Sequence, residues 1–518
     1  MSAIVKKIVI VGGGAAGWLT AGIVAAEYRA SEGGIEIVVV ESPDVAIIGV
    51  GEGTWPSMAA SLKKMGISET EFMLACDASF KQGSKFINWT TENDCFYYHP
   101  FTLPEAHNEI NLAAHWLPYR HSISFADAVC PQSHLSDRHL APKQITTPEF
   151  AANANYGYHL DAVKFAQFLR RHCVDVLGVK HIADHVVHVN SCYNGDIRSV
   201  ATKYQGDVTG DLFIDCTGFA ALLIGEHYQI PFKKLDHILF NDSALAVQVP
   251  YTEPDAPIAS CTLSTAQDCG WIWDIGLPTR RGIGHVFSSA HSTDEQVEHN
   301  LRRYLELTIG KAAAEQLTTR KLQFNPGHRE IFWHKNCVAV GIAAGFIEPL
   351  EATALVLVEL SAQMIAEQLP VNRSSMDIIA KRFNQKFSNN WQRIVEFLKL
   401  HYVISKRQSS NYWLSHYKKE SIPEGLQELL TLWTHQAPWK HDIRGDEMFP
   451  FASYQYVLYG MGYETELAPL RVRQLMFEQE KAQKLFAANT ARTQKFIANL
   501  PTNRALLHKL RDYGFAKI

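Results

Sequence analysis

A glycine-rich turn near the amino terminus has the spacing of a phosphate cradle. It reads Gly12-Gly-Gly14-Ala15-Ala16-Gly17, a G-x-G-x-x-G sequence. In such a turn Gly12 permits the tight bend, Gly14 lets the backbone approach a pyrophosphate, and Gly17 lets a helix pack on a strand. The helix amino terminus, with Ala15 and Ala16 in its first turn, then faces the phosphate. This spacing predicts a dinucleotide site.

The elements that must position this turn are present on both sides of it. A β-branched run at residues 7–11 predicts a buried parallel strand, and the apolar stretch 15–28 predicts a helix. A second strand at 35–40 ends in Glu41, at the distance expected for a carboxylate that binds the ribose hydroxyls of an adenosine. A glutamate at this place disfavours the 2′-phosphate of NADP.

Two later segments favour FAD over NAD. The apolar stretch from Asp211 runs into Asp215, Thr217 and Gly218, and the apolar stretch 337–340 runs into a second glycine turn that contains Gly345 and Pro349-Leu350. Three nucleotide-facing turns spread over the chain predict an α/β, Rossmann-like FAD-binding fold of the flavin monooxygenase type, interrupted by insertions. We expect the FAD module at 1–90, 155–225 and 330–370. A mainly helical substrate module should comprise 91–154, 226–329 and 371–518.

Composition excludes other classes of protein. The chain has 518 residues and a net charge of −4, so it lacks the basic field that nucleic-acid binding needs. The uncharged run 8–26 resembles a signal peptide or a membrane span, but Gly12, Gly13, Gly14 and Gly17 interrupt it and a strand-turn-helix accounts for it. We therefore expect a cytoplasmic protein without a membrane partner. Nine scattered cysteines and 23 histidines show no metal-ligand spacing, and no metal is expected.

Several further stretches resemble the flavin-dependent tryptophan halogenases, and the resemblance covers most of the chain. The most specific is Gly270-Trp271-Ile-Trp273-Asp-Ile-Gly276, which differs from the family's Trp-x-Trp-x-Ile-Pro only in having Gly276 for proline. The others are Ile48-Gly-Val-Gly51-Glu-Gly53-Thr, Phe80-Lys81 followed by Phe86-Ile-Asn-Trp89, His99-Pro-Phe101, Tyr158-His-Leu-Asp161, Glu348-Pro-Leu-Glu351, the run from His401 to Ser405, and Asn411-Tyr-Trp413.

The resemblance implies that reduced FAD, oxygen and chloride or bromide form hypohalous acid, which crosses an internal passage to an aromatic substrate. Two sites must then be separated, because free hypohalite would oxidise methionine, cysteine and the flavin. The sequence contains a single G-x-G-x-x-G and hence no nicotinamide module. A separate NAD(P)H-dependent flavin reductase is therefore the expected partner. A homodimer is left open.

The resemblance assigns the catalytic roles to Lys81 and Glu351. A lysine in an apolar pocket can form a haloamine or hydrogen-bond hypohalous acid as ammonium, and the sequence does not decide which. Glu351 would orient the oxidant and take up the proton lost when the ring rearomatises, although a simple ion pair is the alternative. Halide would bind the backbone N–H groups of Thr353 and Ala354 at the start of a helix over 352–369. Here Ala352-Thr-Ala354 replaces the family's usual Ser-Thr-Gly.

Other positions receive roles on the same ground. Trp271 and Trp273 would guard the flavin against ordinary monooxygenase chemistry, or simply support the core. His99, Phe101 and Trp413 lie at substrate-side positions, and Gly51 lies in a flavin-side stretch. The region 449–466 does not match the contacts that hold the amino-acid part of tryptophan. An indole, another small aromatic or a larger substrate therefore fits as well as free tryptophan. A flavin hydroxylase and a non-catalytic flavin-binding protein are the alternative functions.

Overall fold

The computed structural model describes residues 4–45, 49, 51–93, 95–443 and 447–517. Within these residues the chain forms two compact units. Unit 1 comprises Met1–Ala78, Leu160–Leu235 and Phe324–Trp391, and unit 2 comprises Ser79–His159, Asp236–Gln323 and Gln392–Ile518. Each unit is therefore assembled from three separate stretches of sequence. Of the family-like stretch 48–54, Ile48 and Val50 lie outside the described residues.

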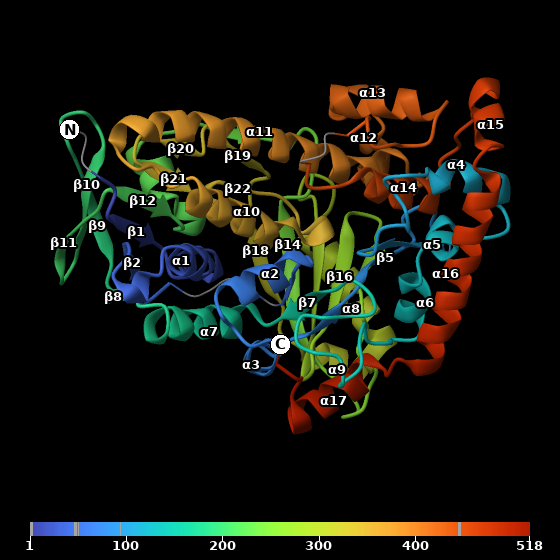
Figure 1. Ribbon diagram of the computed structural model, residues 1–518, viewed down its shortest axis with the longest axis horizontal. Helices are drawn as coiled ribbons and strands as arrows, with labels where there is room; N and C mark the ends of the chain where they lie inside the picture. Colours follow the sequence, from blue (N-terminus) through green and yellow to red (C-terminus); the bar gives the residue numbers. More distant parts are fainter. Residues whose placement is uncertain (1–3, 46–48, 50, 94, 444–446, 518) are drawn as a thin grey trace. The chain divides into compact units, whose positions relative to one another are not determined.

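Unit 1 is built on a six-stranded sheet with the strand order β20-β21-β12-β1-β2-β8, in which only the edge strand β20 is antiparallel to its neighbour (Figure 1). The strands are β1 (Lys7–Val11), β2 (Glu36–Glu41), β8 (Lys180–Ala183), β12 (Leu212–Asp215), β20 (Trp333–His334) and β21 (Cys337–Ala339). β1 lies in the middle, with Ile8 opposite Ile37 on one side and Leu212 on the other. Its apolar residues Ile8 to Val11 are buried, as expected for a parallel strand covered on both faces.

The helices of unit 1 pack around α1 (Ala15–Glu27), which contacts both α7 (Ala162–Asp175) and α10 (Thr353–Glu367). α1 is apolar nearly all round and its residues 17–25 are buried, which explains why its sequence resembled a membrane segment. The other elements are β3 (Glu52–Gly53), α2 (Ser57–Lys64), α3 (Glu69–Ala75), β13 (Phe232–Lys234), β19 (Gly327–Arg329) and β22 (Gly345–Phe346). The long helix α11 (Arg373–Val403) begins in unit 1, and the division between the units falls within it.

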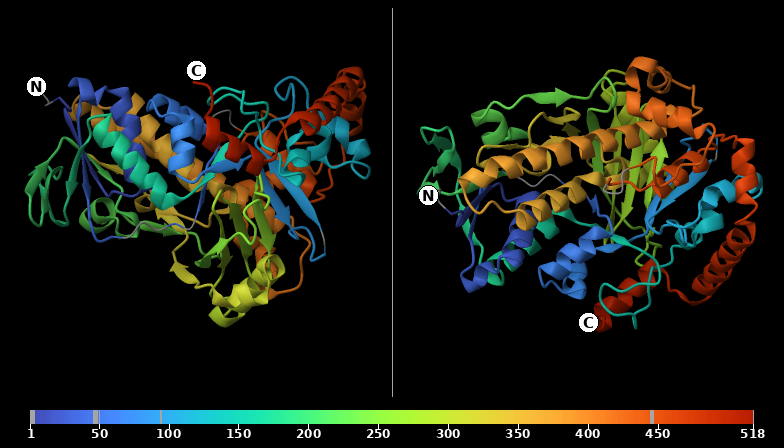
Figure 2. Two further views of the ribbon diagram at one scale, coloured as in Figure 1. Left: turned by 90° about the horizontal axis from the view of Figure 1, so that it is seen from below. Right: turned by 45° about the horizontal axis from the view of Figure 1, so that its top comes forward.

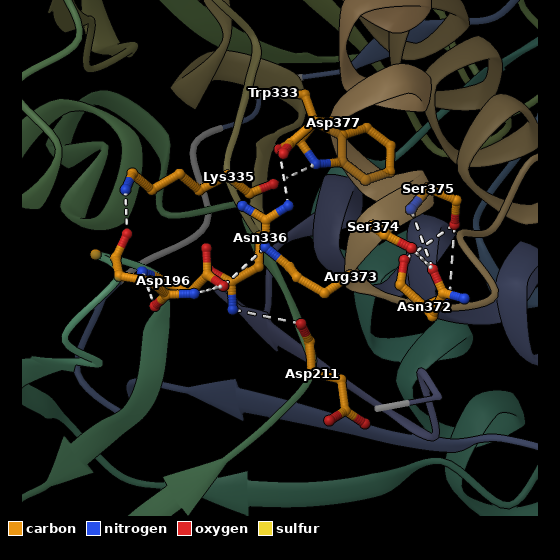
Figure 3. Close-up of polar contacts among 12 residues, drawn as sticks. Asp196, Asp211, Trp333, Lys335, Asn336, Asn372, Arg373, Ser374, Ser375 and Asp377 are labelled. Atoms are coloured by element: carbon orange, nitrogen blue, oxygen red, sulfur yellow. Dashed lines mark hydrogen bonds and ion pairs between the residues drawn. The ribbon is translucent and has the colours of Figure 1, made fainter. Parts of the chain in front are cut away.

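A three-stranded antiparallel meander projects from unit 1 (Figures 1 and 2). It consists of β9 (Val186–Ser191), β10 (Ile197–Thr202) and β11 (Gly206–Thr209). Figure 3 shows the polar contacts that fasten it: the amide of Asn336 bonds both the N–H and the C=O of Ile197, each at 2.8 Å, and Arg373 contacts Asp196 at 2.7 Å. These partners lie more than 130 residues apart in sequence, so the network joins the meander to the sheet and to α11.

Unit 2 combines a seven-stranded sheet with many helices. The strand order is β18-β14-β17-β16-β15-β5-β6, antiparallel throughout except between β15 and β5. The strands are β5 (Gly83–Ile87), β6 (Phe96–Pro100), β14 (Ser243–Pro250), β15 (Thr262–Ala266), β16 (Trp271–Gly276), β17 (Arg280–Phe287) and β18 (Arg320–Gln323). β4 (Ser79–Lys81) and β7 (Gly157–Leu160) are antiparallel neighbours in another, three-stranded sheet, with Lys81 opposite Gly157.

The helices of unit 2 come from all three of its sequence stretches. They are α4 (Leu112–Trp116), α5 (Phe125–Val129), α6 (Gln132–Asp137), α8 (Asp294–Ile309), α9 (Lys311–Gln316), α12 (Asn411–His416), α13 (Glu424–Trp433), α14 (Phe451–Gly460), α15 (Pro469–Leu475), α16 (Gln479–Asn499) and α17 (Asn503–Tyr513). The stretches 377–416 and 471–515 each form several helices with breaks between them.

Candidate active site

A cavity of about 520 Å³ lies in unit 1 at the carboxyl ends of the parallel strands. The residues that follow β1, β2, β8, β12 and β21 all contribute to its wall, among them Gly12, Ser42, Asp184, Cys216 and Gly341. Ligands of open α/β sheets bind at this end, because the loops there diverge and leave a crevice. The volume falls within the range of small-molecule and cofactor sites.

The predicted glycine turn forms one side of this cavity. Gly12 has φ +114°, and a side chain there would meet the carbonyl of Cys216. A side chain at Gly17 would meet the carbonyl oxygen of Gly12, so this glycine permits the close packing of helix on strand. A side chain at Gly14 would meet nothing, because this position opens onto the cavity. α1 starts here without a side-chain cap, which leaves its first N–H groups to a ligand.

Glu41 lies at the end of β2 on the same wall. Its Oε2 is 2.9 Å from Nε2 of His181 and 3.9 Å from Nη1 of Arg170. The side chain lies directly over Gly13, where a Cβ would come within 2.1 to 2.4 Å of the Glu41 side-chain atoms. Gly13 is therefore required by the position of Glu41, a role that the motif spacing alone did not reveal.

Several predicted cofactor residues lie on the cavity wall and others lie behind it. The predicted residues that line the wall are Gly12, Gly14, Ala15, Ala16, Glu41, Gly218, Gly345 and Pro349. Those that do not line it, within the described part of the chain, are Gly17, Gly51, Asp215 and Leu350. Asp215 is fully buried, and its carboxylate accepts hydrogen bonds from Thr217 N and Oγ1 and from the N–H groups of Leu223 and Ile224. It therefore shapes the turn after β12 instead of facing the cavity.

Sequence reasoning missed Asp184, which follows β8 and lies on the wall. Its carboxylate accepts the N–H groups of His185, Tyr204 and Gln205 at 2.8 to 2.9 Å, so its role is to hold the loop. The run 180–183 was not identified as a strand. Had it been, the rule that ligands bind beyond the carboxyl ends of parallel strands would have marked Asp184.

The amino terminus of α10 also forms part of the cavity wall. Thr353 and Ala354 both line it, and no side chain caps the helix. The helix begins at Thr353, one residue later than predicted, because Glu351 and Ala352 both have left-handed backbone conformations, with φ +67° and +55°. The N–H of Ala352 donates to Pro349 O at 3.0 Å, and the indole N–H of Trp55 donates to Glu351 O at 2.8 Å. These two bonds hold the turn that starts the helix.

The strain in this turn gives a testable expectation. An alanine in the left-handed region costs about 1 kcal/mol that a glycine avoids. We expect Ala352→Gly to raise the free energy of unfolding by up to about 1 kcal/mol, whereas Ala354→Gly, in the helical first turn, should lower it by about 0.5–1 kcal/mol. Chemical denaturation of both variants checks this. Equal effects of the same sign would show that the conformation of Ala352 carries no strain.

Within α10, on the side that faces α2, Glu359 is fully buried. It accepts hydrogen bonds from Ser57 Oγ at 3.0 Å and Ser61 Oγ at 2.5 Å, both on α2. Burial raises its pKa to about 7, and the two hydroxyl groups only partly offset that effect. Glu359 thus connects the helix that faces the cavity with α2, and it is protonated on the acid side of neutrality.

Lys81 lies in unit 2, at the end of β4, and only 1% of its surface is exposed. Its Nζ is 5.2 Å from the centre of the Phe101 ring, a cation–π distance. His159, opposite Ser79 on β7, shares this side of the strand pair. Its Nε2 lies 2.8 Å from Thr262 Oγ1, and burial together with the charge of Lys81 holds its pKa well below the ordinary range. The neighbouring imidazole is therefore neutral.

The predicted substrate residues differ in their surroundings. Phe101 contacts Lys81, and His99 Nε2 lies 2.9 Å from Ser453 Oγ with its ring beside Phe397. Trp413 is fully buried among other aromatic rings, and its indole N–H donates to Gln267 O at 2.9 Å. The position of Trp413 favours a core role.

Trp271 and Trp273 lie on one face of β16, and both are buried in unit 2. The Trp271 ring lies 6.3 Å from that of Trp89, and Trp273 covers Gly284, where a Cβ would overlap its ring. Both rings thus have a packing role in the sheet. Their gating role stays a prediction.

Three observations bear on other kinds of site. Among the described residues, no helix combines the length and the apolar character that crossing a bilayer requires. Over the same residues, no cluster of three or more His, Cys, Asp or Glu side chains is arranged to hold a metal ion. The nine cysteines are free thiols.

Comparison with known proteins identifies the family. The family model described as tryptophan halogenase matches residues 7–475. The crystal structure of a tryptophan halogenase from Shewanella frigidimarina NCIMB 400 is 52% identical, covers 99% of both chains and has a TM-score of 0.96. Tryptophan 7-halogenase RebH from Lentzea aerocolonigenes is 30% identical over 98% of this chain and 99% of its own length. Xcc4156, a flavin-dependent halogenase from Xanthomonas campestris, is 30% identical, covers 99% of both chains and has a TM-score of 0.87.

These likenesses confirm the predicted α/β, Rossmann-like fold and the predicted resemblance. The chain belongs to the tryptophan halogenase family and is a flavin-dependent halogenase.

Proposed function

We propose that this halogenase uses reduced FAD, oxygen and chloride or bromide to halogenate an electron-rich aromatic compound, an indole or tryptophan-like molecule. The observation that carries the proposal is the cavity of unit 1, onto which two helix amino termini open without side-chain caps. One suits a pyrophosphate and the other suits a halide. A separate NAD(P)H-dependent flavin reductase supplies the reduced cofactor.

The cavity wall fits FAD. The open position at Gly14 and the start of α1 would hold the pyrophosphate, and Glu41 would hold the adenosine ribose. The flavin side of the cavity has Gly345 and Pro349 in its wall. When bound, reduced flavin would supply the two electrons that bring oxygen to the oxidation level of peroxide, which is an oxidant strong enough to convert the halide to hypohalous acid. The N–H groups of Thr353 and Ala354 would bind that halide. Ala354 is exposed, and its methyl group would limit the space beside the bound halide.

Lys81 is the proposed residue that delivers the oxidant to the substrate. Its burial removes the hydration that an ammonium group has in water, so a bound hypohalous acid would interact with it strongly. The ring of Phe101 and the neutral His159 lie beside it. Glu351 is proposed to orient the oxidant and to accept the proton lost from the ring. His99 and Phe101 are proposed to contact the aromatic substrate.

The decisive experiment is an incubation of the protein with FAD, a generic flavin reductase, NADH and bromide or chloride. A panel of indoles and phenols is offered, and mass spectrometry detects products. We expect a halogenated product that depends on halide and on reduced flavin. Product without halide would indicate a hydroxylase instead. Bound FAD without any product across the panel would indicate a flavin-binding protein without turnover.

A variant of Glu41 tests the proposed cofactor site separately. Glu41→Gln should weaken FAD binding about tenfold, since a hydrogen bond to a charged group contributes about 1.5 kcal/mol. Glu36→Gln is the matched control, because Glu36 lies at the other end of β2 and pairs with Lys7 and Lys180. Quenching of flavin fluorescence measures both affinities. An unchanged affinity in Glu41→Gln would remove Glu41 from the ribose site.

A further inference from the structure

The carboxy-terminal segment, residues 500–516, follows the long helix α16 and contains α17 (Figure 1). It lies beyond residue 475, where the family match ends. Three backbone hydrogen bonds fasten it to the loop 139–149: Ala141 N to Pro501 O at 2.8 Å, Asn503 N to His139 O at 2.7 Å, and Glu149 N to Ala516 O at 2.9 Å. The segment is therefore an ordered part of unit 2.

This segment contacts β4 at the residue that precedes Lys81. The buried amide of Asn503 donates from Nδ2 to Phe80 O at 3.2 Å. The ring of Phe515 lies 6.3 Å from that of Phe80, which is fully buried. Both the backbone and the side chain of Phe80 are thus held by the end of the chain.

A buried lysine completes the arrangement. Lys143 has no exposed surface, and its Nζ lies 4.0 Å from the centre of the Phe515 ring and 6.0 Å from that of Phe80. It donates hydrogen bonds to Pro148 O at 3.0 Å and to Tyr156 OH at 3.4 Å. A desolvated ammonium group over an aromatic face is a strong attraction, so Lys143 fixes the ring of Phe515 from the loop 139–149.

The residue on the other side of Lys81 is anchored as well. Gln82 is buried, its Nε2 donates to Leu140 O at 2.7 Å, and its N–H donates to Ser260 O at 2.6 Å. Because neighbouring side chains of an extended strand point to opposite faces, Phe80 and Gln82 are fixed on the side away from Lys81. The backbone that carries Lys81 is thereby held at both flanking positions.

We propose that Asn503, Phe515 and Lys143 are positioning residues for Lys81. The inference rests on the proposed function, in which Lys81 delivers the oxidant. A displacement of about 1 Å at a reacting group can cost about 100-fold in rate, and the flexible side chain of a lysine transmits any shift of its backbone. Loss of the positioning residues then lowers delivery of the oxidant to the substrate, without affecting its formation in the cavity of unit 1.

The test compares Phe515→Ala and Asn503→Ala with the wild type and with Tyr513→Ala. Tyr513 is 79% exposed, so its variant is a matched control near the same end of the chain. The steady-state rate of formation of brominated product gives kcat and KM. The ratio of product formed to NADH consumed gives the coupling. We expect kcat and coupling to fall at least tenfold in Phe515→Ala and Asn503→Ala, with KM within twofold. Phe515→Tyr, which keeps the aromatic ring face, should retain the wild-type kcat and coupling.

Each other outcome has a defined meaning. Unchanged kcat and coupling in both variants, with Lys81→Ala inactive, would overturn the inference and leave the proposed function intact. Product from Lys81→Ala at the wild-type rate would remove Lys81 from the mechanism and, with it, this inference. Absence of product from the wild type would refute the proposed function itself. If Phe515→Ala does not fold, Asn503→Ala and Lys143→Met decide the question by the same measurements. A parallel loss of folded protein and activity, with coupling unchanged in the folded fraction, would also overturn the inference.

Discussion

Lys81→Ala is expected to lower the rate of halogenated product formation by about 10³-fold or more. The reason is that the substitution removes the group proposed to deliver the oxidant to the substrate. A positioned side chain that takes part in such a step contributes about 10²–10⁴ in rate. Halide oxidation is proposed to take place in the cavity of unit 1, so it should continue in this variant. A soluble trap for hypohalite, assayed beside the halogenated product, measures the two steps separately.

The matched control for this experiment is Lys85→Ala. Lys85 lies four residues away on β5, where it pairs with Asp137 at 2.9 Å and contacts the ring of Phe96. Loss of this partly exposed ion pair should change stability by less than about 1 kcal/mol and leave the product rate within about twofold. Retention of product in Lys81→Ala would remove Lys81 from the mechanism. A loss of both hypohalite and product would place Lys81 at the halide step instead.

The local parts of the site could be predicted from the sequence because their physics is local. The turn from Gly12 to Gly17, Glu41 at the end of its strand and the helix that begins at Thr353 are each specified by fewer than 20 consecutive residues. Glycine spacing and hydrophobic periodicity report such features directly. The boundaries of α1 and of α10 accordingly agree with the predicted ones to within two residues.

The remaining features depend on contacts between distant residues. Gly13 matters because Glu41 lies over it, and Trp55 matters because its N–H reaches Glu351 across 296 residues of sequence. The contact of Asn503 with Phe80 spans 423 residues. No local pattern encodes such pairs. The role of Asp215 was misplaced for a related reason: a carboxylate after a strand fits a cofactor ligand and a turn-forming residue equally well, and only its four hydrogen bonds distinguish the two.

The second large effect is expected for stability as a function of pH, through Glu359. Its pKa is about 7 in the folded protein and near the ordinary value of 4.5 in the unfolded chain. Between these two values the folded state holds a proton that the unfolded state has lost. The free energy of unfolding therefore falls as the pH rises through this window, and it levels off above about pH 7. The total loss is about 3 kcal/mol.

Glu359→Gln should remove that loss, because the neutral amide keeps the shape of the side chain and its hydrogen bonds to Ser57 and Ser61. At pH 8 the variant should be more stable than the wild type by about 3 kcal/mol, whereas at pH 5 the two should differ little. Urea unfolding at both pH values gives the comparison, with Glu367→Gln on the exposed side of the same helix as the control. An equal difference at pH 5 and pH 8 would show that Glu359 does not titrate in this window. The same variant also tests whether the contact between α10 and α2 affects the halide site proposed at the amino terminus of α10. The measurement is the rate of halogenation as a function of chloride concentration.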